Sequence, residues 1–428
     1  MNEPDIITVE EWDSCEVPLD EAVYTYLRAR YSRQLEVSRT EHTGVYRVAA
    51  RDYVGRIGLS GGGMLVIRPK VGVSNLFYML AADAGLAHFQ PPPAGLAHDP
   101  EIFTFILAVL IEQAEKLFRQ GLYRAYLPRE EDLPFVRGRI IVGAQVRHHA
   151  ELKHRHICAY ADLTPDTAEN RVLAATLRLL PSLLSRSRVQ DPRSKVSDGM
   201  TLDSRLLQRA RALLPRFDGV GIISRSQALA LLPTITFHRL NAPYEQILSL
   251  CRLALQHLTL DERPGPHPFA SFLIDMPRLF EGFVTARLRA HLAGHGLRVV
   301  AQRHDYLDEA RKVGIRPDVL VYKSGPTSAA SPLLVLDAKY RRLEGDNPDL
   351  NPDLYQVSAY LDRYKLQRGI LVYPQFKEAA HTEVRLRGTV KQLYLATLNL
   401  AVPNPQQLEQ NCALLAEQVA RLSPEIQA

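Results

Sequence analysis

The order of apolar blocks between residues 270 and 373 is the feature that most constrains how this chain folds. A helix-like stretch at about 270–294 precedes strand-like blocks near 297–303, 317–322 and 333–339, and then come a helix-like stretch near 351–364 and the strand-like LQRGILVY. A helix, three strands, a helix and a strand in this order predict a compact mixed α/β domain. The segment DERPGPHP at 261–268, rich in proline and charge, marks where this domain begins.

The preceding part of the chain has a different pattern. Residues 33–70 alternate in short β-like stretches between glycine and polar turns, and NLFYMLAADAGL and about 100–127 have helical spacing. The β-like VRGRIIVGAQV and the His-rich KHRHICAY follow, and 166–256 is mostly helical. We therefore predict an α/β multidomain protein with a mixed, β-rich N-terminal domain at 1–165, a helical connecting region at 166–260 and the α/β domain at 261–428.

Composition limits the classes of function. The net charge of +5, from 52 basic and 47 acidic residues, permits a nucleic-acid partner without requiring one. The four cysteines lie far apart without a Cys-x-x-Cys pair, which indicates neither a disulfide framework nor a cysteine zinc site and favours a reducing cytoplasm. The acidic N-terminus lacks the order of a signal peptide, and the longest apolar run, 103–111, is too short to span a bilayer, so we expect no membrane role.

The block LLVLDAKY ends a predicted core strand with an acid and a base. Asp337 and Lys339 are two apart on a strand, so both point to the same side. A surface ion pair alone would explain them and would stabilise little. However, Asp318 directly follows Pro317 at the start of the preceding predicted strand, and strand pairing would bring Asp318 beside Asp337. Two adjacent carboxylates repel each other, and a divalent cation such as Mg²⁺ relieves that repulsion.

These groups predict phosphodiester cleavage. Mg²⁺ held by Asp318 and Asp337, with the main-chain carbonyl of Ala338, would polarise a phosphate oxygen, while Lys339 would orient water and offset developing charge. Gln356 and Tyr360 are four apart on a predicted helix and could reach the site or the DNA backbone, and Glu281 on the preceding helix could add a metal ligand, hold a water or be a solvated acid.

Two other motifs are weaker candidates. GLSGG at 58–62 matches a nucleophile elbow in its letters, but a strand-like segment follows it, which favours a glycine-rich hairpin. His148, His149, His154 and His156 lack the paired spacing of a zinc site, so we interpret this cluster as a basic, partner-facing ribbon. The chain has neither a Walker A motif nor a Gly-x-Gly-x-x-Gly after a strand, so nucleotide energy would have to come from another chain.

With Asp318, the Asp337-Ala338-Lys339 run, Gln356 and Tyr360 in this element order, the C-terminal part resembles the PD-(D/E)xK nuclease superfamily. More narrowly, the chain resembles McrC, the nuclease subunit of McrBC-type modification-dependent restriction systems. The resemblance rests on LFEGFV, RPDVLV, LDAKY and YQVSAY, and in the N-terminal half on MLVIRPKVGVSNLFYML, GLYRAYLPREEDLPFVRGRI and TAENRVLAATL. The loop KSGPTSAASP lengthens the gap from Asp318 to Asp337 beyond the family pattern, which we expect to leave the paired strands intact.

The resemblance implies a Mg²⁺-dependent endonuclease subunit that joins a hexameric McrB-like AAA+ GTPase, stimulates its GTP hydrolysis and cuts double-stranded DNA. The partner would recognise the modified cytosine, and the N-terminal part of this chain would contact the motor. Two alternatives stay open: a repair or recombination nuclease of the same superfamily that works with a helicase, and a non-catalytic activator of the AAA+ partner.

Overall fold

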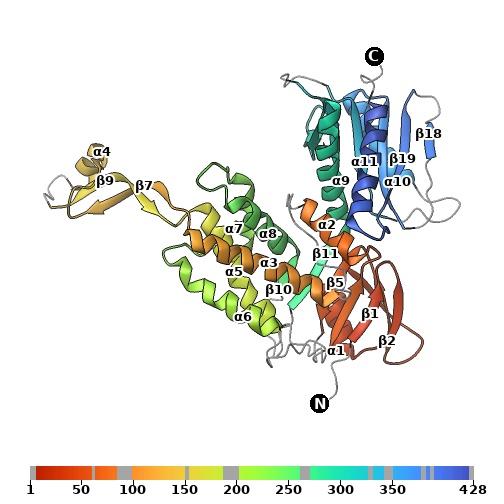
Figure 1. The fold of residues 1–428 in the computed structure, drawn as a ribbon, viewed down its shortest axis with the longest axis horizontal. Coiled ribbons are helices and arrows are strands. Elements are labelled where there is room, and N and C mark those ends of the chain that lie inside the picture. The colour runs from red at the N-terminus through yellow and green to blue at the C-terminus, as the bar shows by residue number, and fades with distance from the viewer. Residues whose placement is uncertain are drawn as a thin grey trace. The chain divides into compact units, whose positions relative to one another are not determined.

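The computed structural model describes residues 6–59, 63–83, 99–149, 154–186, 202–260, 270–325, 331–341, 350–376, 382–385 and 390–423. The chain divides into two compact units (Figure 1). The first combines Met1–Phe103 with His257–Ala428, and the second is Thr104–Gln256. In the part of the chain that the structure describes, no helix has the length and apolar character needed to cross a membrane.

The N-terminal part of the first unit is rich in short strands, as predicted. Its elements are β1 (Ile6–Glu10), β2 (Ser14–Pro18), α1 (Glu21–Arg30), β3 (Leu35–Arg39), β4 (Val45–Ala50), β5 (Tyr53–Gly58), β6 (Met64–Arg68) and α2 (Val73–Asp83). The four β-like stretches predicted within 33–70 correspond to β3 through β6. A strand, β6, follows the GLSGG segment and pairs antiparallel with β5, as expected for a hairpin, while residues 60–62 lie outside the described residues.

Two sheets organise this part. Strands β2, β4 and β3 form one antiparallel sheet. The other has the order β1-β6-β5-β11-β10, in which β10 (Leu258–Leu260) and β11 (Ala270–Asp275) come from much later in the chain. The predicted segments 1–165, 166–260 and 261–428 run consecutively, whereas the observed first unit is discontinuous, because β5 pairs with β11.

The C-terminal part contains the predicted order of a helix, three strands, a helix and a strand, but the helix expected from about residue 270 begins at Met276, because Ala270–Asp275 pairs with β5 as the strand β11. These elements are α9 (Met276–Leu292), β12 (Leu297–Ala301), β15 (Val319–Lys323), β16 (Leu334–Ala338), α10 (Asn351–Tyr364) and β17 (Arg368–Gln375). The structure adds η3 (Ala293–His295), β13 (Asp305–Tyr306), β14 (Gly314–Ile315), β18 (Thr382–Arg385), β19 (Gln392–Asn399) and α11 (Pro405–Leu422). The mixed α/β, multidomain character predicted from the sequence is confirmed.

The central sheet of this part has the strand order β12-β15-β16-β17-β19-β18. Strands β12, β15 and β16 are antiparallel neighbours, and β16, β17 and β19 are parallel. The antiparallel pairing of β15 with β16 confirms that the long connection between them leaves the paired strands intact. Helix α10 covers the face of the sheet that includes Val335 and Leu371, where it buries Val357, Tyr360 and Leu361.

Helices α2 and α9 join the N-terminal and C-terminal parts of the first unit. Gly282 on α9 faces the carboxylate of Asp83 on α2 so closely that a Cβ at this position would overlap it. The buried Asn75 on α2 donates to the main-chain oxygens of Leu400 and Val402, at 3.2 and 2.6 Å. The N-terminal part is therefore built into the same unit as the C-terminal sheet.

The second unit is mainly helical, as predicted for most of it. Its helices are α3 (Asp99–Gln120), α5 (Ala168–Arg186), α6 (Leu202–Leu213), η1 (Leu214–Phe217), α7 (Arg225–Leu231), η2 (Leu232–Thr234) and α8 (Tyr244–His257). A buried hydrogen-bond network ties them together: Tyr244 donates to Asn170 Oδ1 at 2.6 Å, and Asn170 donates to the oxygen of Tyr123 at 2.8 Å.

An arm extends from these helices within the second unit (Figure 1). It consists of β7 (Ala125–Leu133), β8 (Arg139–Ile140), α4 (Val142–His149) and β9 (His156–Thr164), with β9 paired antiparallel to both β7 and β8.

Two predictions were wrong here. The helix expected to reach about residue 127 ends at Gln120, because Gly121 has a φ of +92° that stops it. The β-like VRGRIIVGAQV is strand only at Arg139–Ile140 and is otherwise largely helical, because the Gln145 side chain bonds the backbone of Arg155 and Ile157 at and just before the start of β9.

Candidate active site

Strand β16 carries an acid at the end of a fully buried apolar run. Residues Leu334, Val335 and Leu336 are inaccessible to solvent, and Asp337, which follows them, is only 1% exposed. Because side chains alternate along a strand, Asp337 and Lys339 lie on the same face as Val335, the face covered by α10. The sequence thus places a carboxylate where only apolar residues would otherwise be expected.

Asp318 reaches the same strand end from β15. The register pairs Val319 with Leu336, so Asp318 lies opposite Asp337. Its Oδ2 accepts a hydrogen bond of 2.8 Å from the main-chain N–H of Ala338. The structure therefore brings together the two aspartates that the sequence suggested.

Lys339 continues this arrangement toward α10. Its Nζ lies 2.6 Å from Asp337 Oδ2 and donates to Gln356 Oε1 at 2.9 Å. Gln356 in turn donates from Nε2 to the hydroxyl of Tyr360 at 2.7 Å, as their spacing of four on one helix allows. Four side chains from β16 and α10 thus form one connected chain of contacts.

Glu281 on α9 borders the same cluster. Gln302, which directly follows β12, donates from Nε2 to Glu281 Oε1, and its main-chain N–H donates to the oxygen of Asp318 at 3.0 Å. Gln302 was not predicted from the sequence. It directly follows the partly buried strand β12, a position that the sequence pattern did not single out.

The pKa values of the acids in this cluster are raised by burial. Burial, and then the charge of Glu281, raises the pKa of Asp318 to about 7. Burial, and then the charge of Asp318, raises the pKa of Asp337 to about 7. Burial raises the pKa of Glu281 as well, although its hydrogen bond with Asp318 opposes the shift. Burial tends to lower the pKa of Lys339, but the charge and hydrogen bond of Asp337 together with the charges of Asp318 and Asp353 raise it overall, so the lysine is held as a cation.

The donor set fits a hard divalent cation. The Lys339 ammonium and the Arg316 guanidinium act on three carboxylates, so negative charge is left in excess, and the buried Asp337 Oδ2 makes no well-aligned hydrogen bond among the described residues. Oxygen donors are what Mg²⁺ prefers. In the described part of the chain no three His, Cys, Asp or Glu side chains are arranged to hold a metal together. The groups that could bind such an ion are Asp318, Asp337 and the carbonyl of Ala338, and Glu281 lies beside them with a hydrogen bond to Asp318. The remaining positions would be left to water or substrate oxygens.

A second polar group, not predicted from the sequence, lies beside the first. Asp353, in the first turn of α10, accepts a 2.7 Å hydrogen bond from the hydroxyl of Tyr373 and lies 2.5 Å from an Arg341 guanidinium nitrogen. The charge of Asp353 also contributes to the raised pKa of Asp337. Arg341 is thus held two residues beyond Lys339.

The histidine cluster lies away from these residues along the chain, on the arm. His148 on α4 and His154 are exposed, His156 begins β9, and the side chain of His149 lies outside the described residues. Cys158, two residues beyond His156, is buried.

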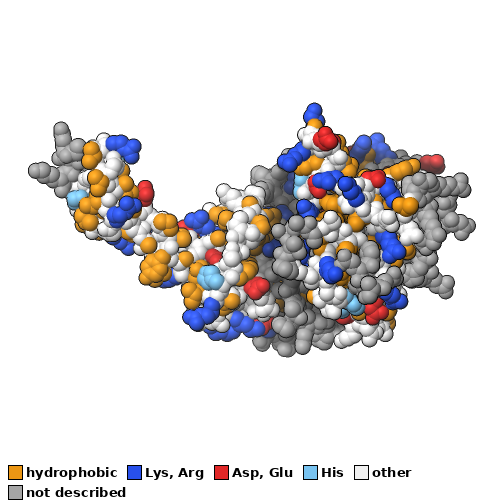
Figure 2. Space-filling view, turned by 90° about the horizontal axis from the view of Figure 1, so that it is seen from above, with side chains coloured by type: hydrophobic (Ala, Val, Ile, Leu, Met, Phe, Trp, Pro, Cys, Tyr) orange, Lys and Arg blue, Asp and Glu red, His pale blue; other side chains and the backbone are white. Residues whose placement is uncertain are grey.

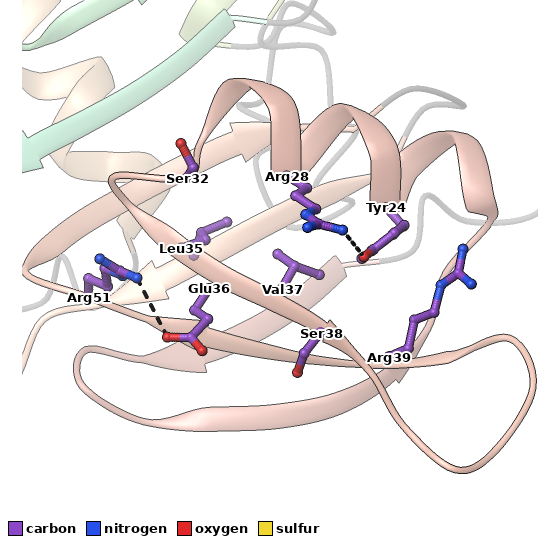
Figure 3. Close-up of a pocket in the computed structure, with 9 residues that line it drawn as sticks. All are labelled: Tyr24, Arg28, Ser32, Leu35, Glu36, Val37, Ser38, Arg39 and Arg51. Atoms are coloured by element: carbon purple, nitrogen blue, oxygen red, sulfur yellow. Dashed lines mark hydrogen bonds and ion pairs between the residues drawn. The ribbon is translucent and has the colours of Figure 1, made fainter.

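A groove of about 540 Å³ lies elsewhere in the first unit, between α1 and the edge strand β3 (Figure 3). Its charged lining is Arg28, Arg39, Arg51 and Glu36, and two of the arginines are already paired with carboxylates. It contains none of the predicted site residues.

Comparison with known proteins identifies the family of the chain. The family model of McrBC 5-methylcytosine restriction system components matches residues 48–374. The type IV methyl-directed restriction enzyme EcoKMcrBC of Escherichia coli strain K12 is 23% identical over 358 residues, which is 78% of this chain and 94% of that protein. A chain in the half-complex of Thermococcus gammatolerans McrB AAA+ hexamers with bound McrC has the same fold, with a TM-score of 0.52 and 18% identity over 97% of this chain and 100% of that chain.

Proposed function

Because the chain belongs to the family of McrBC 5-methylcytosine restriction system components, we propose that it is the nuclease subunit of such a system. It would be a Mg²⁺-dependent endonuclease of the PD-(D/E)xK superfamily that acts on double-stranded DNA. The observation that carries the proposal is the meeting of Asp318, Asp337 and Lys339 at one strand end, with an excess of buried negative charge.

The residues divide the chemistry among them. A Mg²⁺ ion held by Asp318, Asp337 and the Ala338 carbonyl would supply a Lewis acid beside the scissile phosphodiester. Lys339 Nζ, fixed between Asp337 and Gln356, is placed to orient the attacking water and to offset charge that develops on the phosphate. Gln356 and Tyr360 hold the lysine from α10, and either could also contact the DNA backbone. Glu281 and Gln302 border the site, where Glu281 could hold a water.

The partner is proposed from the related assembly. The matched structure is described as McrB AAA+ hexamers with bound McrC, and we extend this partnership to the present chain. The partner would hydrolyse GTP and recognise modified cytosine, and this chain would stimulate the hydrolysis.

The arm of the second unit is the candidate surface for that partner. Phe135, Val136, Val142 and Val146 are each more than half exposed there. Figure 2 shows hydrophobic side chains mixed with Lys and Arg along the arm. Exposed apolar side chains gathered in one region of a surface are typical of protein-protein contacts.

The test is reconstitution with an McrB-like GTPase, GTP and Mg²⁺ on methylated and unmethylated plasmid. We expect cleavage of the methylated plasmid, and we expect Asp337→Asn and Lys339→Ala each to reduce it by at least about 100-fold while binding of the partner is retained. Lys391→Ala is the matched control, because Lys391 also pairs with an aspartate, Asp362, at 2.7 Å, but lies outside the site.

The other outcomes separate the alternatives. Stimulated GTP hydrolysis without cleavage in Mg²⁺ or Mn²⁺ would identify a non-catalytic activator. Cleavage that depends on a helicase and not on the GTPase would identify a repair nuclease.

A further inference from the structure

Tyr340, the residue after Lys339, contacts residues near the N-terminus of the chain. Its ring is 5% exposed and lies 5.0 Å from Trp12, 5.6 Å from Phe280 and 6.4 Å from Phe376, measured between ring centroids. Trp12 belongs to the turn after β1, Phe280 to α9, and Phe376 directly follows β17. An aromatic cluster from three parts of the first unit thus holds the residue next to the proposed catalytic lysine.

A buried acid completes this contact. Glu11, which directly follows β1, is fully buried, and its Oε2 accepts a hydrogen bond of 3.3 Å from the Tyr340 hydroxyl. The same oxygen accepts a 3.2 Å bond from the main-chain N–H of Lys70. The other oxygen, Oε1, has no hydrogen-bond partner among the described residues. A carboxyl group in such a place costs free energy, so its presence in the core is not explained by stability alone.

The turn that carries Glu11 is itself fixed. Trp12 has a φ of +60°, a conformation that L-residues rarely adopt, and its indole N–H donates to Asp52 Oδ1 at 2.6 Å. The main-chain N–H of Glu11 donates to the oxygen of Arg68 at 2.9 Å. Hydrogen bonds within the N-terminal part therefore fix Glu11 and Trp12 where they contact Tyr340.

The effect on Lys339 follows from chain geometry. Lys339 is anchored to β17 by its main-chain N–H, which donates to the oxygen of Val372 at 2.8 Å. Its other neighbour in the chain is Tyr340. If the ring and hydroxyl of Tyr340 are held, the peptide between residues 339 and 340 has little freedom to rotate, and the direction of the Lys339 side chain is set.

We propose that Glu11, Trp12 and Tyr340 form a positioning contact through which the N-terminal sheet sets the placement of Lys339 in the site. The inference rests on the proposed nuclease function and assigns to the N-terminal part a role in the chemistry. Glu11 and Tyr340 are positioning residues, because neither touches the proposed metal or substrate directly.

The experiment measures cleavage by the reconstituted complex for Tyr340→Phe, Glu11→Ala, Glu11→Gln and the double variant Glu11→Ala with Tyr340→Phe. Tyr340→Phe removes only one oxygen and keeps the ring packing. We expect Tyr340→Phe and Glu11→Ala each to lower kcat by roughly 10- to 100-fold, with KM for DNA and partner GTPase stimulation unchanged. The double variant should lose no more than either single variant, because both break the same bond. Glu11→Gln should retain most of the activity, because its amide oxygen also accepts a hydrogen bond.

Tyr53→Phe is the matched control. The Tyr53 hydroxyl also donates to a carboxylate, Asp275 Oδ2 at 3.0 Å, within the same N-terminal sheet, so its loss tests stability without touching the contact. Equal kcat for Tyr340→Phe, Glu11→Ala and Tyr53→Phe would overturn the positioning role, as would losses that add in the double variant. A wild-type complex that cuts no better than Asp337→Asn would instead overturn the proposed function and the inference together.

Discussion

At the scale of single residues, the site is defined by charge that the fold does not neutralise. Asp318 and Asp337 are held next to each other by the pairing of β15 with β16, and Lys339 offers one positive charge. Burial raises the pKa of both aspartates to about 7, helped by the charge of Glu281 at Asp318 and by the charge of Asp318 at Asp337. Carboxylates placed this close to each other destabilise the folded chain. The same closeness is needed if the carboxylates bind one cation together.

A pH dependence of stability follows from Asp337. Its pKa is raised from 3.8 to about 7 on folding, so between these values the folded chain binds more protons than the unfolded chain. Stability should therefore fall as pH rises from about 4 to 7 and stay reduced above it. Without metal, the free energy of unfolding of Asp337→Asn relative to that of the wild type should rise by on the order of 1–3 kcal/mol from pH 5 to pH 8. Chemical denaturation at the two pH values measures this difference.

Added Mg²⁺ provides the complementary measurement. At pH 8 it should stabilise the wild type and leave Asp337→Asn unchanged, because the variant has lost one of the two carboxylates. Asp362→Asn, at an exposed aspartate paired with Lys391, is the control and should respond to Mg²⁺ as the wild type does. A pH 5 to pH 8 difference that is the same for all three proteins would contradict this account.

At the scale of elements, the site depends on how closely α10 approaches the sheet. The helix presents Gln356 and Tyr360 to Lys339, and its Val357 and Leu361 pack over β17 at Gly369. A Cβ at Gly369 would lie 2.8 Å from Val357 Cγ1 and 3.1 Å from Leu393 Cδ2. The glycine thus allows the close packing that brings the helix to the lysine.

Gly369→Ala should therefore push α10 away from the sheet. We expect a loss of about 1–3 kcal/mol in the free energy of unfolding and a fall in cleavage by the reconstituted complex, because Gln356 moves with the helix. Gly325→Ala is the control, since a Cβ there meets no atom within 4 Å. Equal stability of the two variants in urea denaturation would show that α10 adapts without cost.

At the scale of the whole molecule, the proposed chemistry and the proposed partner surface belong to different compact units. The carboxylates and Lys339 lie in the first unit, and the arm with its exposed apolar residues lies in the second. This division suits a nuclease whose activity depends on a motor, because the surface that binds the partner can differ from the site that cuts.

The arm can be tested without disturbing any core. Val142 and Val146 on α4 are 68% and 63% exposed, so Val142→Asp with Val146→Asp should leave thermal stability nearly unchanged. We expect the pair to weaken binding of the McrB-like partner by at least about tenfold and to reduce GTPase stimulation in proportion. Leu414→Asp, at a residue 60% exposed on α11, is the control. Partner binding by the arm variant equal to that of the control would rule out α4 as the contact.

Some features could be predicted from the sequence because they depend on local pattern. The order of elements around Asp318 and Asp337 follows from apolar periodicity, and the shared face of Asp337 and Lys339 follows from the alternation of a strand. The spacing of Gln356 and Tyr360 likewise places both on one side of α10. These relations hold between near neighbours in the chain, so they can be read before the fold is known.

Other features were decided only by the tertiary structure, because they join residues that are distant in the chain. Nothing in the local pattern indicates that β5 pairs with β11, that Gln302 meets Glu281, or that Glu11 bonds the tyrosine beside Lys339. The same holds for α4, a helix in a β-like segment, where the Gln145 side chain bonds the backbone of Arg155 and Ile157. The sequence by itself determined which side chains could do the chemistry, and long-range packing determined which residues hold them in place.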